Sequence, residues 1–135
     1  MSVRLINPAT EKKIAEYKMD SSVRLRRVLH EAHSSQPDWG RQALSLRIPK
    51  ILELAERIGS RREELAKQIT LEMGKPIRQA FSEVDKSVSS IQTICEQMPR
   101  WLAQRETCLP SGYGVRLCPL GVTLGIMPWN FPVWQ

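Results

Sequence analysis

The chain has 135 residues, enough for one domain with a sizeable buried core. Hydrophobic residues make up 41% and charged residues 25%, a balance typical of globular proteins rather than disordered ones. No stretch is apolar for long enough to cross a bilayer, and MSVRLINPATEKK lacks the apolar core of a secretory signal. We therefore expect a cytoplasmic protein with no membrane partner.

The formal net charge of the chain is +6, from 20 Lys and Arg against 14 Asp and Glu. Such an excess raises the possibility of nucleic-acid binding. The basic residues cluster in RLRR (24–27) and RIGSRR (57–62), on expected helix surfaces, while the aromatic residues lie elsewhere. We interpret both clusters as solvated helix faces and expect no nucleic-acid partner, although a basic helical nucleic-acid binder is kept as an alternative.

The chain is expected to begin with two short strands. Residues 2–7 and 13–19 are extended in pattern, and the NPAT turn at 7–10 would let them pair. Asp20, Ser21 and Ser22 are possible N-caps of a first helix. That helix carries an apolar stripe and is predicted to close at Pro37 and Gly40; the stripe consists of Leu25, Val28, Leu29 and Ala32.

Three more helices are predicted from the same apolar periodicity. The second is expected to begin near Pro49 and to end at Gly59, and Ser60 with Glu63 matches a capping box for the third. Gly74 is a natural left-handed stop for the third helix. The fourth is expected to start around Pro76 and to kink or end near Gln97, because of Pro99.

Several polar residues on these helices are interpreted as ordinary surface groups. Glu72 and Glu83 are predicted to be helix-surface charges. His30 and His33 stand three residues apart without an obvious third ligand, so we expect no metal site. The odd cysteine count (Cys95, Cys108 and Cys118) argues against a disulfide framework, and no base that would activate a thiol is visible.

The apolar run VTLGIM (122–127), bounded by Gly121 and Pro128, predicts a strand buried on both faces. Such a strand needs neighbouring strands and helices over both faces, and no later strand follows within these residues. The sequence therefore predicts an α/β fold, mostly helical in this part, with one core strand at 122–127. We interpret it as the opening of an α/β domain.

Asn130 follows this predicted strand directly, at the end where open α/β sheets bind ligands. Its side-chain amide can donate a hydrogen bond to a developing oxyanion. The alternative is that Asn130 caps a following helix. The local chemistry by itself favours the capping role.

The motif PWNFP (128–132) resembles that of the NAD(P)-dependent aldehyde dehydrogenases. The resemblance extends in order along the chain, through NPAT (7–10), Trp39, TLEMGKP (70–76) and PLGVTLGIMPWNFP (119–132). EMGKPIRQAFSEVDKS (72–87) and IMPWNFPVWQ are most similar to bacterial succinate-semialdehyde dehydrogenases.

The resemblance implies roles for the residues around Asn130. Asn130 would be catalytic, donating its amide to the oxyanion while also beginning a helix. Met127, Pro128 and Trp129, with Asn130, would line NAD or NADP, and Phe131 and Gln135 would face the substrate tunnel. Residues 1–109 and 119–135 would form part of the NAD(P)-binding domain, and 110–118 the start of the oligomerisation arm.

The resemblance also implies what these residues would need from elsewhere. In the family a cysteine thiolate attacks a small aldehyde and a glutamate activates water, and the motifs carrying both come later than Gln135. None of the three cysteines matches the nucleophile's motif. We therefore expect a truncated aldehyde dehydrogenase, inactive alone, with doubtful cofactor binding. The family forms homo-oligomers, and this chain could self-associate or aggregate. The alternative is a non-catalytic module that docks on an intact homologous subunit.

Overall fold

The computed structural model describes residues 2–103, 112–114 and 117–135. Within these residues two strands precede four helices, in the predicted order. The elements are β1 (Ser2–Ile6), β2 (Lys13–Lys18), α1 (Ser22–Arg41), α2 (Leu44–Ser60), α3 (Arg62–Met73) and α4 (Ile77–Ala103). None of the helices among the described residues is both long and apolar enough to cross a membrane.

The two strands form an antiparallel hairpin, which confirms their predicted pairing. Val3 lies opposite Tyr17, and Leu5 lies opposite Ala15. The side-chain oxygen of Asn7 accepts hydrogen bonds from the N–H groups of Ala9 and Thr10, at 2.8 and 3.2 Å. This Asx turn explains why the chain reverses at NPAT.

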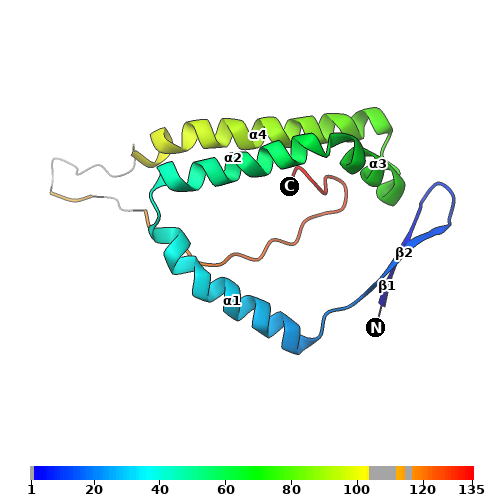
Figure 1. The fold of residues 1–135 in the computed structure, drawn as a ribbon, viewed down its shortest axis with the longest axis horizontal. Coiled ribbons are helices and arrows are strands. Elements are labelled where there is room, and N and C mark those ends of the chain that lie inside the picture. The colour runs from blue at the N-terminus through cyan, green and yellow to red at the C-terminus, as the bar shows by residue number, and fades with distance from the viewer. Residues whose placement is uncertain (1, 104–111, 115–116) are drawn as a thin grey trace.

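The core lies where α2 and α3 pack against α4 (Figure 1). Its buried centre contains Ala66 and Ile69 of α3 and Ala80 and Val84 of α4. Because alanine carries only a methyl group, two of these positions let the helix backbones approach closely. Val133, from the C-terminal segment, also packs against this cluster.

Helix ends follow the predicted signals at two places. The Ser21 hydroxyl accepts a hydrogen bond from the N–H of Arg24 at 3.2 Å, as an N-cap does. Gly74 ends α3 with a φ of 74°, in the left-handed region that glycine adopts at little cost.

Prolines end these helices less sharply than we predicted. Pro37, Pro49 and Pro99 all lie inside helices, in α1, α2 and α4. A proline removes one hydrogen bond, which a helix with continuing apolar periodicity can tolerate near its ends. The predicted capping box is also wrong: Ser60 belongs to α2, where its hydroxyl donates to the carbonyl of Arg57 at 3.0 Å.

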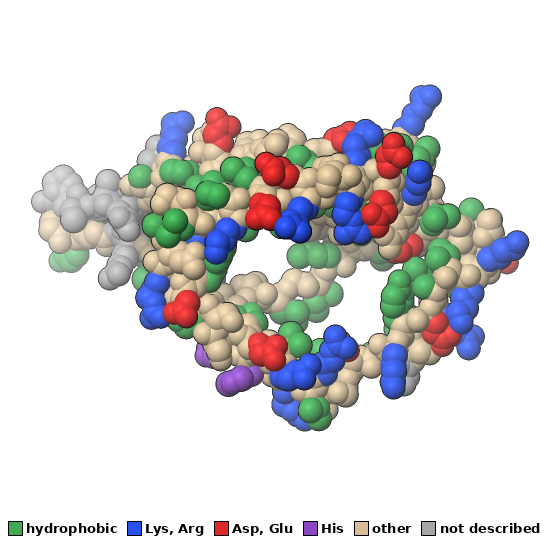
Figure 2. Space-filling model, in the orientation of Figure 1, with side chains coloured by type: hydrophobic (Ala, Val, Ile, Leu, Met, Phe, Trp, Pro, Cys, Tyr) green, Lys and Arg blue, Asp and Glu red, His purple; other side chains and the backbone are tan. Residues whose placement is uncertain are grey.

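The predicted core strand at 122–127 is wrong for this structure. Residues 117–128 are extended but form no strand, and no described strand lies beside them to supply hydrogen bonds. Leu124 is 84% exposed and Ile126 87% exposed. Figure 1 shows this segment starting beside α1 and crossing towards α3 and α4, and Figure 2 shows open space between it and α2.

Helix α1 stands apart from the helical core (Figure 1) and buries none of its residues. Its predicted apolar stripe is exposed at Leu25, Val28 and Leu29. The predicted oligomerisation arm at 110–118 is described only at 112–114 and 117–118, and Cys108 lies outside the described residues.

Arginines in the two basic clusters pair with carboxylates. Arg24 pairs with Asp20 at 2.9 Å, and Arg57 pairs with Glu53 at 2.7 Å. Arg61 likewise pairs with Glu64 at 2.6 Å. This pairing agrees with the interpretation of both clusters as solvated helix faces.

Candidate functional site around Asn130

Asn130 lies in a turn that folds back onto the helices at residues 129–134. Residues 131–135 form turns with no helix among them. The N–H of Gln135 donates to the carbonyl of Phe131 at 3.2 Å, which is a single helical hydrogen bond. One such bond does not offset the cost of starting a helix. The Asn130 side chain is exposed, and within the described residues it makes no hydrogen bond.

The turn is held by the carboxylate of Glu83, on α4. One Glu83 oxygen accepts hydrogen bonds from the N–H groups of Val133 at 3.0 Å and Trp134 at 3.4 Å. The other accepts from the ammonium of Lys75. Glu83 is 3% exposed, so the predicted surface position is wrong. A carboxylate this deeply buried is stable only when its oxygens are paired, as they are here.

Lys75 connects Glu83 to Asn130. Lys75 is 8% exposed, and its ammonium also donates a hydrogen bond to the main-chain oxygen of Asn130 at 2.7 Å. The same nitrogen lies 3.9 Å from the ring centroid of Phe131. One cation thus binds the backbone of Asn130 and the side chain of the next residue.

Trp134 extends the contact along α4. Its indole N–H donates to the Ser90 hydroxyl at 3.2 Å, and the ammonium of Lys86 lies 3.6 Å from its ring centroid. The Phe131 and Trp134 rings meet edge to face, with centroids 5.9 Å apart. The turn is therefore fixed on one face of α4 by polar, cation–π and aromatic contacts together.

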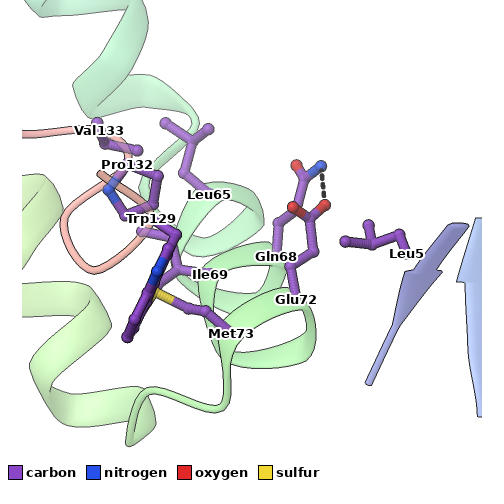
Figure 3. Close-up of a pocket in the computed structure, with 9 residues that line it drawn as sticks. All are labelled: Leu5, Leu65, Gln68, Ile69, Glu72, Met73, Trp129, Pro132 and Val133. Carbon is purple, nitrogen blue, oxygen red and sulfur yellow. Dashed lines mark hydrogen bonds between the residues drawn. The ribbon is translucent and has the colours of Figure 1, made fainter. Parts of the chain in front are cut away.

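A pocket of about 330 Å³ opens beside this turn (Figure 3). Trp129 stands next to Met73 and Ile69 of α3, and Leu5 of β1 lies across from them. Glu72 forms the polar part of the wall and accepts a hydrogen bond from Gln68 at 2.7 Å. The pocket is mostly apolar and joins the hairpin, α3 and the PWNFP turn.

The structure brings some predicted site residues together and separates others. Phe131 lines a second pocket of about 270 Å³ with Lys75 and Lys86, whereas Trp129 faces the pocket of Figure 3. Met127, Pro128 and Gln135 are exposed. Asn130 is the point at which the chain changes from the open segment to the docked turn.

The sequence reasoning missed Lys75 and Glu83 as functional candidates. Glu83 stands three residues after Ala80 and four before Ser87, both of which are buried. This spacing places it on the buried face of α4, and that signal could have identified it. Lys75 lies between Gly74 and Pro76, where the sequence suggests only a helix junction.

The fit of a dinucleotide to this segment can be judged from the side chains present. Met127 and Trp129 expose apolar surface that fits one side of a flat aromatic ring. Lys75 is already paired with Glu83 and is not free to hold a phosphate. The exposed apolar surface of Met127 and Trp129 is thus compatible with contact to a flat ring, and Lys75 offers no phosphate contact.

No cluster of metal-ligating side chains occurs among residues 2–103, 112–114 and 117–135. Cys95 is a buried free thiol on α4, and Cys118 is an exposed one. Neither position contradicts our expectation that they are not nucleophiles.

Sequence comparison identifies relatives of this arrangement. The model of the aldehyde dehydrogenase family matches residues 1–135. The chain is 36% identical over 131 residues to an NAD(P)+-dependent succinate semialdehyde dehydrogenase of Escherichia coli K12. It is 34% identical over 131 residues to an NADP+-dependent succinate-semialdehyde dehydrogenase of Deinococcus radiodurans. Each alignment covers 96% of this chain and 28% of the relative.

Structural comparison gives the same fold. The chain matches the NADP complex of an NADP-dependent glyceraldehyde-3-phosphate dehydrogenase from Bacillus halodurans C-125, with a TM-score of 0.84. The two are 22% identical, and the match covers 99% of this chain and 30% of that one. The predicted fold class, the N-terminal part of the aldehyde dehydrogenase α/β fold, is thus confirmed, although the strand at 122–127 is not formed. This chain belongs to the aldehyde dehydrogenase family.

Proposed function

We propose that residues 1–135 form the N-terminal part of an aldehyde dehydrogenase that oxidises succinate semialdehyde to the carboxylic acid. The substrate assignment rests on two relatives with that activity in their names, at 36% and 34% identity. The cofactor assignment, NAD or NADP, rests on the same relatives.

Asn130 is the proposed catalytic residue of this chain. When a thiol adds to an aldehyde, negative charge develops on the carbonyl oxygen, and a neutral amide can donate a hydrogen bond to it. The observation that supports this role most directly is that the backbone of Asn130 is held by Lys75 while its side chain is exposed. A donor on a fixed backbone needs little reorganisation when the charge forms.

The neighbouring residues have supporting roles in this proposal. Met127, Pro128 and Trp129 would lie along NAD(P), which supplies the hydride acceptor when bound. Phe131 and Gln135 would form part of the substrate tunnel. The cysteine nucleophile and the glutamate base would come from residues beyond 135, so we propose that a polypeptide of residues 1–135 has no dehydrogenase activity by itself.

A chimaera tests the proposal directly. Residues 1–135 would replace the aligned part of the E. coli relative, which supplies the rest of the enzyme. We expect the chimaera to oxidise succinate semialdehyde with NAD(P)+. Asn130→Ala in the chimaera should lower kcat by about 10²–10³-fold, the usual cost of losing one oxyanion donor.

The matched control is Gln92→Ala, which removes an exposed amide from α4, away from the turn. It should leave kcat within about twofold, because isolated surface substitutions rarely disturb a fold. A folded, cofactor-binding chimaera that oxidised other aldehydes but not succinate semialdehyde would overturn the substrate assignment. Full activity of the Asn130→Ala form would overturn the catalytic one.

A second candidate function is a non-catalytic module that docks on an intact homologous subunit. The observation in its favour is the exposed apolar surface of α1 and of the segment containing Leu124 and Ile126. Co-purification of residues 1–135 with a full-length homologous dehydrogenase would support it. A stable solitary monomer in the presence of that dehydrogenase would argue against it.

A further inference from the structure

The strongest unassigned feature is the buried ion pair of Lys75 and Glu83. Its carboxylate accepts from two backbone N–H groups, those of Val133 and Trp134, while its ammonium donates to the main-chain oxygen of Asn130. Each charged group therefore has two kinds of partner: the other charge, and the backbone of the turn. Every hydrogen bond that the pair makes to the turn goes to main chain, and the one side chain of the turn that Lys75 contacts is the Phe131 ring.

We propose that Lys75 and Glu83 are positioning residues, which form a latch that fixes the turn of Asn130 and so aims its amide. The catalytic part of this inference rests on the proposed function of Asn130. The other part, that the pair holds the turn, does not rest on it, because the contacts of the turn can be measured in the isolated chain without any activity.

The latch requires a hydrogen-bond donor at position 75 and an acceptor at position 83. Position 75 must supply a donor, because its partner at Asn130 is a carbonyl oxygen. Position 83 must supply an acceptor, because its partners at Val133 and Trp134 are N–H groups. An ordinary ion pair survives when its two charges are exchanged, whereas this latch cannot.

Because the pair is buried, an apolar replacement can test its effect on the turn separately from its effect on the stability of the fold. Replacing a buried ion pair with apolar residues of similar volume is often neutral or stabilising for the fold. The double variant Lys75→Met with Glu83→Leu therefore keeps a packed interior while removing the three hydrogen bonds that the pair makes to the backbone of the turn. If the double variant stays folded but its turn is no longer held on α4, the pair has a positioning role.

The experiment measures amide hydrogen exchange by NMR in the chain of residues 1–135. In the double variant, we expect exchange at Val133 and Trp134 to accelerate by about 10–100-fold, the usual range for lost hydrogen bonds to a charged group. The amide of Gly74, which donates to Thr70 within the α3 cap at 3.0 Å, should exchange as before. Unchanged exchange at residues 133 and 134 would overturn the latch.

Three further variants sharpen the result. The exchanged pair, Lys75→Glu with Glu83→Lys, should release the turn as fully as the apolar pair does, and retention of the turn would contradict the latch. Glu83→Gln is isosteric and keeps one accepting oxygen, so it should accelerate exchange less than Glu83→Leu. Asp85→Leu removes an exposed carboxylate two residues away and should leave exchange at residues 133 and 134 unchanged.

The same variants in the chimaera test the aim of the amide. We expect the apolar pair to lower kcat by about tenfold or more, with KM changed less than twofold. The conservative variant Lys75→Arg should keep much of the parent's kcat. Released exchange with unchanged kcat would overturn the positioning of Asn130. If Asn130→Ala itself kept full activity, the proposed catalytic role of Asn130 would fail, and the latch would be judged on exchange alone.

Discussion

The ammonium of Lys75 donates a hydrogen bond to the main-chain oxygen of Asn130 at 2.7 Å, across 55 positions of sequence. Lys75 occupies the short junction between α3 and α4, directly after Gly74. A residue of the α3–α4 junction thus helps to hold the turn, together with Glu83 of α4. Changes at that junction should reach Asn130 through Lys75.

The first prediction concerns Gly74. Its φ is 74°, and a Cβ at this position would stand 3.0 Å from the Cγ of Pro8. Gly74→Ala should therefore destabilise the chain by about 1–2 kcal/mol, measured by urea unfolding, because an L residue is strained in this conformation. Loosened contacts of Lys75 should also increase exchange at residues 133 and 134.

Gly59→Ala is the matched control. Gly59 lies in the last turn of α2, where a new Cβ would meet only the Val88 side chain, at 3.7 Å. This substitution should be neutral or stabilise by up to about 1 kcal/mol, because alanine favours helices. Equal effects of the two substitutions would contradict the argument from backbone conformation.

The second prediction concerns the α3–α4 interface. Val84 is fully buried beside Ala66 and Ala80. Val84→Ala should lower the free energy of unfolding by about 2 kcal/mol, which combines lost transfer energy with a small cavity. The half-exposed Leu71 on α3 offers a comparison, and Leu71→Ala should cost about 0.5 kcal/mol or less. A Val84→Ala chain as stable as its parent would show that α3 and α4 do not form the core in solution.

The third prediction concerns pH. Arg62 of α3 donates two hydrogen bonds to Asp85 of α4, at 2.5 and 2.7 Å, and these hold the pKa of Asp85 below its usual value. Since the folded pKa is lowered, the pair stabilises the fold above the unfolded pKa of an aspartate, about 3.9. That contribution is lost as the pH falls through the folded pKa.

The measurement is thermal unfolding of the parent and of Asp85→Asn at pH 7 and in steps below pH 4. The parent should melt slightly higher at pH 7, and the difference should shrink as the pH falls. The effect should be small because both side chains are exposed to solvent and screening salt. A difference that grew on acidification would have the wrong sign for this pair.

Local sequence signals predicted the parts of the fold that depend on near neighbours. The hairpin follows from Asn7, whose side chain closes the turn, and the end of α3 follows from the left-handed preference of Gly74. The helices follow from apolar periodicity, although Pro37, Pro49 and Pro99 misled the prediction of their ends.

Distant partners account for what the sequence did not predict. The local spacing of Glu83 places it on the buried face of α4, but its partners are backbone N–H groups 50 and 51 positions away, which no local pattern contains. The run at 122–127 has the composition of a strand, but a strand exists only with a partner. The motif around Asn130 identified the family, while the means by which its turn is held required coordinates.

The last prediction follows from α1, which exposes Val23, Leu25, Val28 and Leu29 on a helix without buried residues. Apolar surface of this kind promotes association. Sedimentation equilibrium of residues 1–135 should therefore give an average mass above the monomer's 15.5 kDa, rising with concentration.

Leu25→Glu should lower that average at equal concentration, because the new charge lies within the apolar stripe. Ser34→Glu adds the same charge to the opposite side of α1, nine positions further along the helix, and should change the average mass much less. If both substitutions lowered it equally, the cause would be net charge rather than the apolar stripe, and a parent that stayed monomeric at all concentrations would show that α1 does not drive association.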